Sequence, residues 1–224
     1  LPLRTCDTRS AGASTPPEPG YTMADLADDA AAVLSALGVA AAHVFGFSMG
    51  GMVALNLVLR PPERVRGLGL GCTSAGGRLV VQPDAPVLER LIAPPATGDR
   101  RRDFLNGLWV SLGDRCRTED VETVAQLADA AAANPQTAPG YLGQLAAIQT
   151  HDVVDRLGEI HAPTLVLHGT ADRLVPVENG RILAARIPGA ALILYPDAGH
   201  MFFVEEAAAV NRDIRNFLLA AVAA

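Results

Sequence analysis

A serine within a Gly-x-Ser-x-Gly pattern is the residue of this sequence whose surroundings most clearly indicate chemistry. Ser48 lies in the string Gly46-Phe47-Ser48-Met49-Gly50, between two apolar runs. A strand, a tight turn and a helix in this order expose such a serine as a nucleophile. The amide of Met49, at the start of the helix, would face an oxyanion that develops on an attacked carbonyl. The alternative interpretation is a glycine-rich turn with an unreactive serine.

A serine hydroxyl needs a general base, and the base needs an acid that orients it. His200 and Asp172 are the candidates because each follows an expected strand by a few residues, Ala191–Tyr195 and Thr164–His168 respectively. The carboxyl ends of parallel strands meet at one edge of a sheet, where such sites are built. We therefore predict Ser48 as nucleophile, His200 as general base and Asp172 as the orienting acid.

The other polar candidates are expected to be structural. Asp197 is the nearest rival of Asp172, but it lies three residues before His200, in the same loop, where forming a turn is its more typical role. No His or Cys pair has the spacing of metal ligands, so neither a metal nor a cofactor is predicted. The remaining histidines, which we expect to be packed and hydrogen-bonded, are His43, His151, His161 and His168.

The elements that must position these residues alternate between helix and strand. Thr22 followed by Asp25 predicts the N-cap of a helix that continues to Leu37. This alternation indicates an α/β protein with a mainly parallel sheet and helices on both faces. Besides the two strands named above, we expect strands at 39–47 and 65–72 and helices at 52–59, 177–185 and 204–222.

The alternation of helix and strand stops between the second and third expected strands. A loop is expected over Pro83–Gly98, and helical spacing recurs at 103–112, 119–133 and 141–149. We interpret residues 74–150 as a helical cap insertion, and residues 1–73 and 151–224 as the core domain. Aromatic and apolar residues at helical spacing usually pack together. We therefore expect Phe104, Leu108 and Trp109 to form the core of the insertion more readily than to line a substrate pocket.

The composition of the chain argues against some classes of binding partner. The chain has 224 residues, of which 50% are hydrophobic, enough for one substantial core. A net charge of −6 argues against binding nucleic acid, which needs clustered positive charge. No apolar run approaches the roughly 20 residues of a membrane helix, and three widely spaced cysteines are typical of a reducing cytoplasm. We expect a small-molecule partner, while the oligomeric state is not indicated.

Several strings resemble the α/β-hydrolase family. Residues 7–14 (DTRSAGAS) are similar to its Asp-x-Arg-Gly-x-Gly-x-Ser loop, residues 164–176 (TLVLHGTADRLVP) to its acid loop, and Gly199-His200 to its histidine motif. The strings at 151–157 and 179–181 most resemble the branch of 3-oxoadipate enol-lactonases and related bacterial esterases. The resemblance implies two-step acyl transfer from a carboxylic ester or lactone to Ser48 and then to water.

Two departures from the family pattern affect this expectation. Ser10 stands where the family usually has glycine. The family's early strands and its His-Gly loop, which supplies a second oxyanion donor, would lie upstream of Leu1. We therefore expect an N-terminally incomplete α/β-hydrolase fold, in which the missing donor would cost about 10²–10³ in rate.

Two further classes of function also fit these residues, namely other chemistry on the same fold and ligand binding without catalysis. Perhydrolases of the haloperoxidase type and carbon–carbon bond hydrolases use the same Ser-Asp-His set on this fold, so the sequence does not separate them from esterases. A catalytically impaired binding module of the same fold is the second possibility. The missing oxyanion loop favours it, whereas three catalytic residue types at converging loop ends disfavour it.

Overall fold

The structure is a computed structural model that describes residues 3–9, 11, 12, 14, 20–93, 96–134 and 137–223. Ser10 lies outside the described residues, as does much of the run 9–20, whose Ser, Gly, Pro and Thr residues predict a loop. Within them, the sheet has four parallel strands in the order β1 (Ala42–Phe47), β2 (Val65–Gly71), β3 (Thr164–Gly169) and β4 (Ala191–Tyr195). The predicted parallel α/β sheet is confirmed, and the described residues 3–8 add no strand to it.

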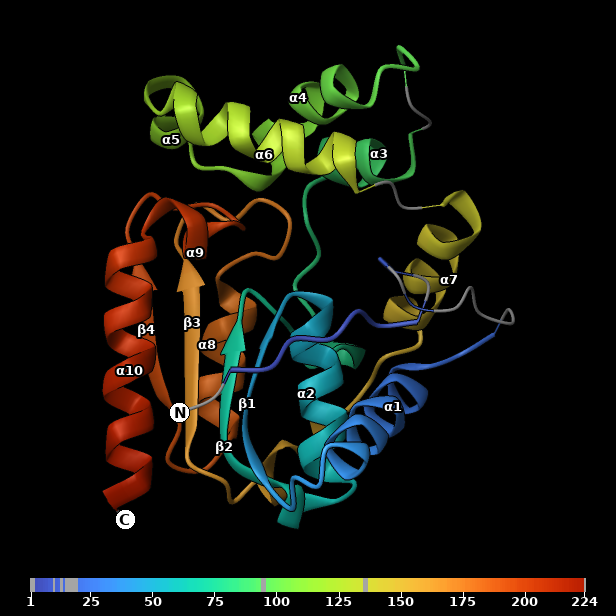
Figure 1. Ribbon diagram of the computed structural model, residues 1–224. Coiled ribbons are helices and arrows are strands. Elements are labelled where there is room, and N and C mark those ends of the chain that lie inside the picture. Colours follow the sequence, from blue (N-terminus) through green and yellow to red (C-terminus); the bar gives the residue numbers. More distant parts are fainter. Residues whose placement is uncertain are drawn as a thin grey trace.

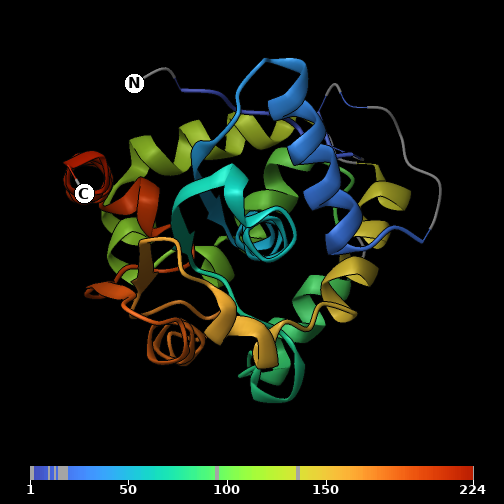
Figure 2. The same ribbon diagram turned by 90° about the horizontal axis from the view of Figure 1, so that it is seen from below.

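Helices cover both faces of this sheet (Figures 1 and 2). Leu68, Leu70 and Val166 belong to one buried cluster, which packs against α1 (Met23–Ala36), α2 (Met49–Leu59) and α8 (Glu178–Arg186). Leu165 and Leu167 point the other way, into a second cluster with α10 (Ala207–Ala223). Successive side chains of a strand face opposite sides, so the unbroken apolar runs are explained by burial on both faces.

The first helix begins as the sequence predicts. The Thr22 hydroxyl accepts a hydrogen bond from the Asp25 amide at 3.3 Å, and the Asp25 carboxylate accepts one from the Thr22 amide at 2.7 Å. This reciprocal pair is a capping box, which satisfies two otherwise free amides at the start of α1.

Alternate glycines of β2 leave room for large side chains of β1. A Cβ atom at Gly69 would overlap the ring of Phe45, and one at Gly71 would overlap the ring of Phe47. Phe45 then packs edge-on against Phe217 of α10, with ring centroids 5.9 Å apart. The glycines of β2 therefore let β1 and α10 share aromatic contacts across the strand between them.

Four predicted elements differ from the structure. The helix expected from Met52 begins at Met49, directly after the turn. The loop expected over Pro83–Gly98 contains α3 (Ala85–Ile92), whose proline lies in the first turn, where no amide donor is needed. The predicted helix 119–133 is α6 (Val121–Ala133), which Asp120 caps, and the separate helix α5 (Asp114–Glu119) before it was not predicted. The last predicted helix is divided into α9 (Phe202–Glu205) and α10.

The helices between β2 and β3 are α3 to α7, including α4 (Arg100–Ser111) and α7 (Ala138–Gln149), and we call residues 85–149 the α3–α7 segment. Helices α3 to α6 lie beyond the carboxyl ends of the strands (Figure 1). Leu108, Leu112 and Cys116 form a buried cluster of their own there. Short 3₁₀ turns at Pro62–Arg64, Gly77–Leu79 and Val154–Glu159 complete the described elements. The division into core and cap stays a prediction, and no helix of the described part could cross a membrane.

The segments before α3 and after α7 are paired through their backbones. The amide of Val153 donates to Ala75 O at 2.9 Å, and the amide of Gly77 donates to His151 O at 3.3 Å. The His151 side chain is buried with 5% exposure, and its Nδ1 lies 3.3 Å from Asn56 Nδ2. Burial lowers the pKa of His151 to about 4, because its charged form would be desolvated.

Gly69→Ala should destabilise the fold, because the added methyl group must displace Phe45 from a filled interface. We expect the free energy of unfolding to fall by about 1–3 kcal/mol, the usual cost of overpacking. Gly158→Ala is the control, since a Cβ atom there meets nothing within 4 Å. Urea unfolding checks this, and equal stability of the two variants would contradict it.

The buried His151 should make the fold sensitive to mild acid. The unfolded chain binds a proton at this residue near pH 6.5, but the folded chain resists it down to about pH 4. Stability is therefore full above pH 6.5 and falls between these values by up to about 3 kcal/mol. His151→Gln should flatten that part of the profile of unfolding free energy against pH. An unchanged slope would show that other groups cause it.

Candidate active site

The backbone at Ser48 is strained. Its φ of 53° and ψ of −124° lie in a region that residues with a Cβ atom rarely adopt. The Ser48 amide donates to Gly71 O at 2.8 Å, which extends the β1–β2 ladder by one residue before α2 begins. Strand, turn and helix thus follow one another without spacer residues, as the motif requires. Met49 is the first residue of α2, at the place from which an amide can face an oxyanion.

Close contacts explain two of the three glycines around this serine. The motif favours Gly46 and Gly50 as the small residues that let the backbone close around Ser48. A Cβ atom at Gly46 would overlap the carbonyl of Gly50, as this interpretation requires. A Cβ atom at Gly50 meets nothing within 4 Å, whereas one at Gly51 would lie 2.5 Å from Thr73 Cγ2. The interpretation is therefore right for Gly46 and wrong for Gly50.

Asp172 and His200 are in direct contact. His200 Nδ1 lies 2.9 Å from Asp172 Oδ2, although the two residues come from the loops after different strands. Both are buried, with exposures of 8% for His200 and 6% for Asp172. The other candidate acid, Asp197, adopts a φ of 59°, and its amide donates to Thr170 Oγ1, which is a turn-forming role.

Hydrogen bonds keep Asp172 charged in spite of its burial. Its Oδ1 accepts the amides of Leu174 at 2.9 Å and Val175 at 2.8 Å. Burial alone would raise the pKa of Asp172, but hydrogen bonds from His168, His200 and the Val175 amide hold it below its ordinary value of 3.8. Asp172 is therefore an anion at neutral pH, the state that orients a neighbouring imidazole and stabilises its charged form.

His168 also belongs to this cluster, which the sequence pattern did not reveal. Its side chain is fully buried, and Nε2 lies 2.8 Å from Val175 O and 3.3 Å from Asp172 Oδ2. Since a carbonyl oxygen only accepts, Nε2 carries the proton. The expectation that His168 ends a strand as a hydrogen-bonded residue holds, but nothing in the sequence indicates that its partner is the predicted acid.

Backbone hydrogen bonds bring the ends of three strands together. Cys72 lies directly after β2, is fully buried and has a φ of 41°. The Ser48 amide donates to Gly71 O at 2.8 Å, and the Cys72 amide donates to Leu167 O at 3.0 Å. The ends of β1, β2 and β3 therefore lie at one edge of the sheet. Burial raises the pKa of the Cys72 thiol, and the charge of Asp172 raises it further.

The three residues weighed as pocket lining lie on α4. Leu108 is buried in the cluster between α4 and α5, and Phe104 packs against it, as expected for core. Trp109 is partly exposed, and its carbonyl accepts a hydrogen bond from Arg173 at 2.9 Å. In the described part of the chain, no group of His, Cys, Asp and Glu side chains could hold a metal ion.

The steric roles of the elbow glycines can be separated by alanine substitution. Gly46→Ala and Gly51→Ala should each lower the free energy of unfolding by about 1–3 kcal/mol, because the added methyl group must displace the Gly50 carbonyl in the first variant and the Thr73 side chain in the second. Gly50→Ala, in the first turn of α2, should be neutral or stabilise by up to about 1 kcal/mol, since alanine favours helix over glycine. Thermal unfolding compares the three variants. A destabilised Gly50→Ala with an unaffected Gly51→Ala would overturn this assignment.

Comparison with known proteins agrees with this architecture. A family profile described as "alpha/beta hydrolase fold" matches residues 5–207. The chain is 32% identical over 199 residues to a protein named putative carbamate hydrolase RutD from Variovorax paradoxus, covering 89% of this chain and 74% of that protein. It is 35% identical over 196 residues to a 2-hydroxy-6-oxo-6-phenylhexa-2,4-dienoate hydrolase from Burkholderia cepacia, covering 83% of this chain and 65% of that protein.

Among solved structures, the enol-lactonase from Burkholderia xenovorans LB400 superposes with a TM-score of 0.80 at 26% identity, covering 95% of this chain and 79% of that one. The chain thus spans between 65% and 79% of the length of these relatives. A family match over nearly the whole chain, together with identities above 30%, leads to one conclusion: this chain belongs to the α/β-hydrolase family.

Proposed function

We propose that this chain is a serine hydrolase that cleaves a carboxylic ester or a lactone through Ser48, His200 and Asp172. The observation that carries the proposal is the 2.9 Å contact between His200 Nδ1 and Asp172 Oδ2, at the same sheet edge as the strained Ser48. A charged, fully hydrogen-bonded acid on one imidazole nitrogen leaves the other nitrogen free to act as a base.

The reaction proceeds in two steps. His200 Nε2 takes the proton of Ser48 Oγ while Oγ attacks the carbonyl carbon, and the Met49 amide stabilises the oxyanion. His200 then gives that proton to the leaving alkoxide, which leaves an acyl group on Ser48. In the second step His200 takes a proton from water while the water oxygen attacks the acyl carbon. His200 then returns that proton to Ser48 Oγ as the bond to the acyl group breaks, so that the carboxylic acid departs and Ser48 is restored.

The relatives support carbonyl chemistry without agreeing on the substrate. Their names describe a carbamate hydrolase, a dienoate hydrolase and an enol-lactonase. Ester or lactone cleavage is our first candidate because the mechanism above needs only the three residues and an oxyanion donor. Cleavage of a carbon–carbon bond is the second, and the 35% identity to the dienoate hydrolase favours it.

Perhydrolysis and simple ligand binding are less well supported. A perhydrolase of the haloperoxidase type would use the same three residues, with hydrogen peroxide in place of water. A binding module of this fold would not need a buried, charged Asp172 that orients a histidine, because such an arrangement contributes to proton transfer and not to ligand affinity. The activity and substrate of the whole protein are proposals in each case.

Product analysis on a substrate panel tests the proposal. The panel contains para-nitrophenyl acetate, a simple lactone, an aryl carbamate and a 2-hydroxy-6-oxodienoate. We expect a carboxylic acid to be released from the ester or the lactone, and Ser48→Ala and His200→Ala to lower that rate by at least about 10³-fold. Turnover of the dienoate alone would replace the ester assignment by the second candidate. Ester turnover that Ser48→Ala leaves unchanged would overturn both.

A further inference from the structure

The junction between α4 and α5 is bonded to the loop that carries His200. We call residues Ser111–Asp114 the α4–α5 junction. The Met201 amide donates to Ser111 O at 2.9 Å. A Cβ atom at Gly199 would lie 2.6 Å from the Gly113 nitrogen and 2.7 Å from the Leu112 carbonyl carbon, so the two backbones are in contact. Both neighbours of His200 in the chain therefore touch the α4–α5 junction.

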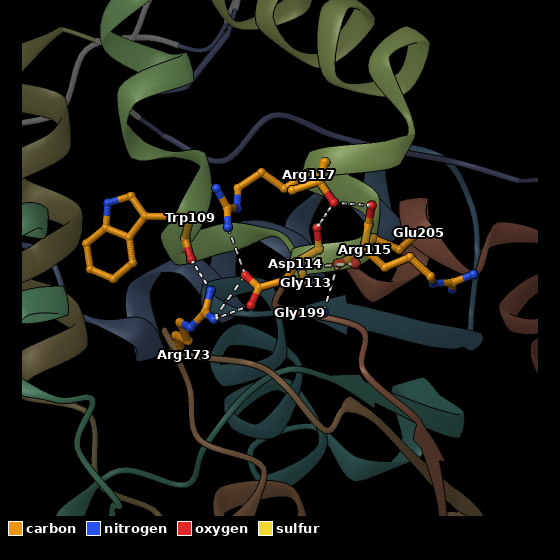
Figure 3. Close-up of polar contacts among 9 residues, drawn as sticks. Trp109, Gly113, Asp114, Arg115, Arg117, Arg173, Gly199 and Glu205 are labelled. Atoms are coloured by element: carbon orange, nitrogen blue, oxygen red, sulfur yellow. Dashed lines mark hydrogen bonds and ion pairs between the residues drawn. The ribbon is translucent and has the colours of Figure 1, made fainter.

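One carboxylate joins these two segments. Glu205 Oε1 accepts the Gly199 amide at 2.8 Å, and Glu205 Oε2 accepts the Gly113 amide at 3.1 Å (Figure 3). Burial raises the pKa of Glu205, which shows that removing this group from water has a cost. The two amides would lack these partners if Glu205 were removed, and a buried amide without a partner is destabilising.

The same junction also reaches the loop of the acid. Arg173 follows Asp172 directly, and its guanidinium donates to both oxygens of Asp114 at 3.1 and 3.2 Å. A further hydrogen bond runs from Arg173 Nη1 to Trp109 O at 2.9 Å (Figure 3). The chain neighbours of Asp172 and of His200 are thus fixed to one short segment. That segment lies about sixty residues before the first of them and about ninety before the second in the sequence.

We propose that Glu205 is a positioning residue for the Asp172–His200 pair, which it holds in register by fixing the Gly199 backbone to the α4–α5 junction. The inference rests on the proposed function and goes beyond it, since it gives the α3–α7 segment a part in catalysis other than covering the substrate. His200 is one residue from Gly199, so a shift of that amide changes the direction of the imidazole. A misplacement of about 1 Å at a reacting group can cost on the order of 10²-fold in rate.

Two substitutions of Glu205 and one control test the inference. Glu205→Ala removes both acceptors. Glu205→Gln keeps the shape but turns an NH₂ group toward one of the two amides, so only one bond survives. Asp103→Asn is the matched control, because Asp103 Oδ1 also accepts two amides of the α3–α7 segment, those of Ala96 at 3.1 Å and Thr97 at 2.9 Å, yet it contacts neither catalytic loop.

The first readout is the kinetics of para-nitrophenyl acetate hydrolysis. We expect Glu205→Ala to lower kcat by about 10- to 100-fold while KM changes by less than about threefold, since Glu205 is proposed to act through His200 and not on the substrate. Glu205→Gln should fall between Ala and the parent, and Asp103→Asn should keep the parent's kcat. An unchanged kcat in Glu205→Ala, or an equal loss in Asp103→Asn, would overturn the inference.

The second readout does not depend on turnover. The proton on His200 Nδ1, held by Asp172, should give a downfield proton resonance in the parent spectrum. We expect this resonance to shift or broaden in Glu205→Gln and to persist in Asp103→Asn. If the parent shows no ester hydrolysis, the proposed function fails, and this resonance alone decides the inference. A resonance identical in the parent and in a folded Glu205→Gln would contradict it.

Discussion

The buried carboxylate of Asp172 is the constraint on which the site depends. A charge taken out of water is tolerated only where hydrogen bonds replace its hydration. Here the amides of Leu174 and Val175 occupy one oxygen, while His200 and His168 approach the other. This requirement fixes the shape of the loop after β3, and it defines where the loop after β4 must place its histidine. The orientation of His200 is therefore a consequence of satisfying a buried anion.

The second constraint is the tight turn at Ser48, which stores strain that the surrounding structure must hold. Gly46 makes room for the Gly50 carbonyl and Gly51 for the Thr73 side chain, and the hydrogen bond from the Ser48 amide to Gly71 O ties the turn to β2. The Cys72 amide, at the end of β2, donates to Leu167 O of β3 and so ties β2 to the strand that leads to Asp172. The rigid parallel sheet thus sets the spacing between Ser48 and the Asp172–His200 pair. The α4–α5 junction fixes the loops after β3 and β4 from the other side. Preorganisation of this kind is what acyl transfer needs, since the reacting groups must be in place before the charge develops.

Much of this arrangement could be predicted from the sequence. Buried strands are recognisable as short apolar runs between turn residues, and the position of Ser48, Asp172 and His200 after such runs predicted that their loops share an edge. The features that could not be predicted are contacts between segments that are far apart in the sequence. The contact of His168 with Asp172, the need for glycine at 51 in place of 50, and the bonds of Glu205 to Gly113 all arise only in three dimensions. The short helix α3 was not predicted because a proline indicates a loop in most positions. Here the proline lies in the first turn of the helix, where it is tolerated.

The most direct test of the proposed catalytic centre is intact-mass analysis after incubation with a fluorophosphonate probe, which reports an activated serine without a guessed substrate. We predict a single covalent adduct on the parent chain and none on Ser48→Ala or His200→Ala. A folded parent chain that forms no adduct, or an adduct that persists in Ser48→Ala, would contradict the claim that Ser48, His200 and Asp172 act together as the catalytic centre.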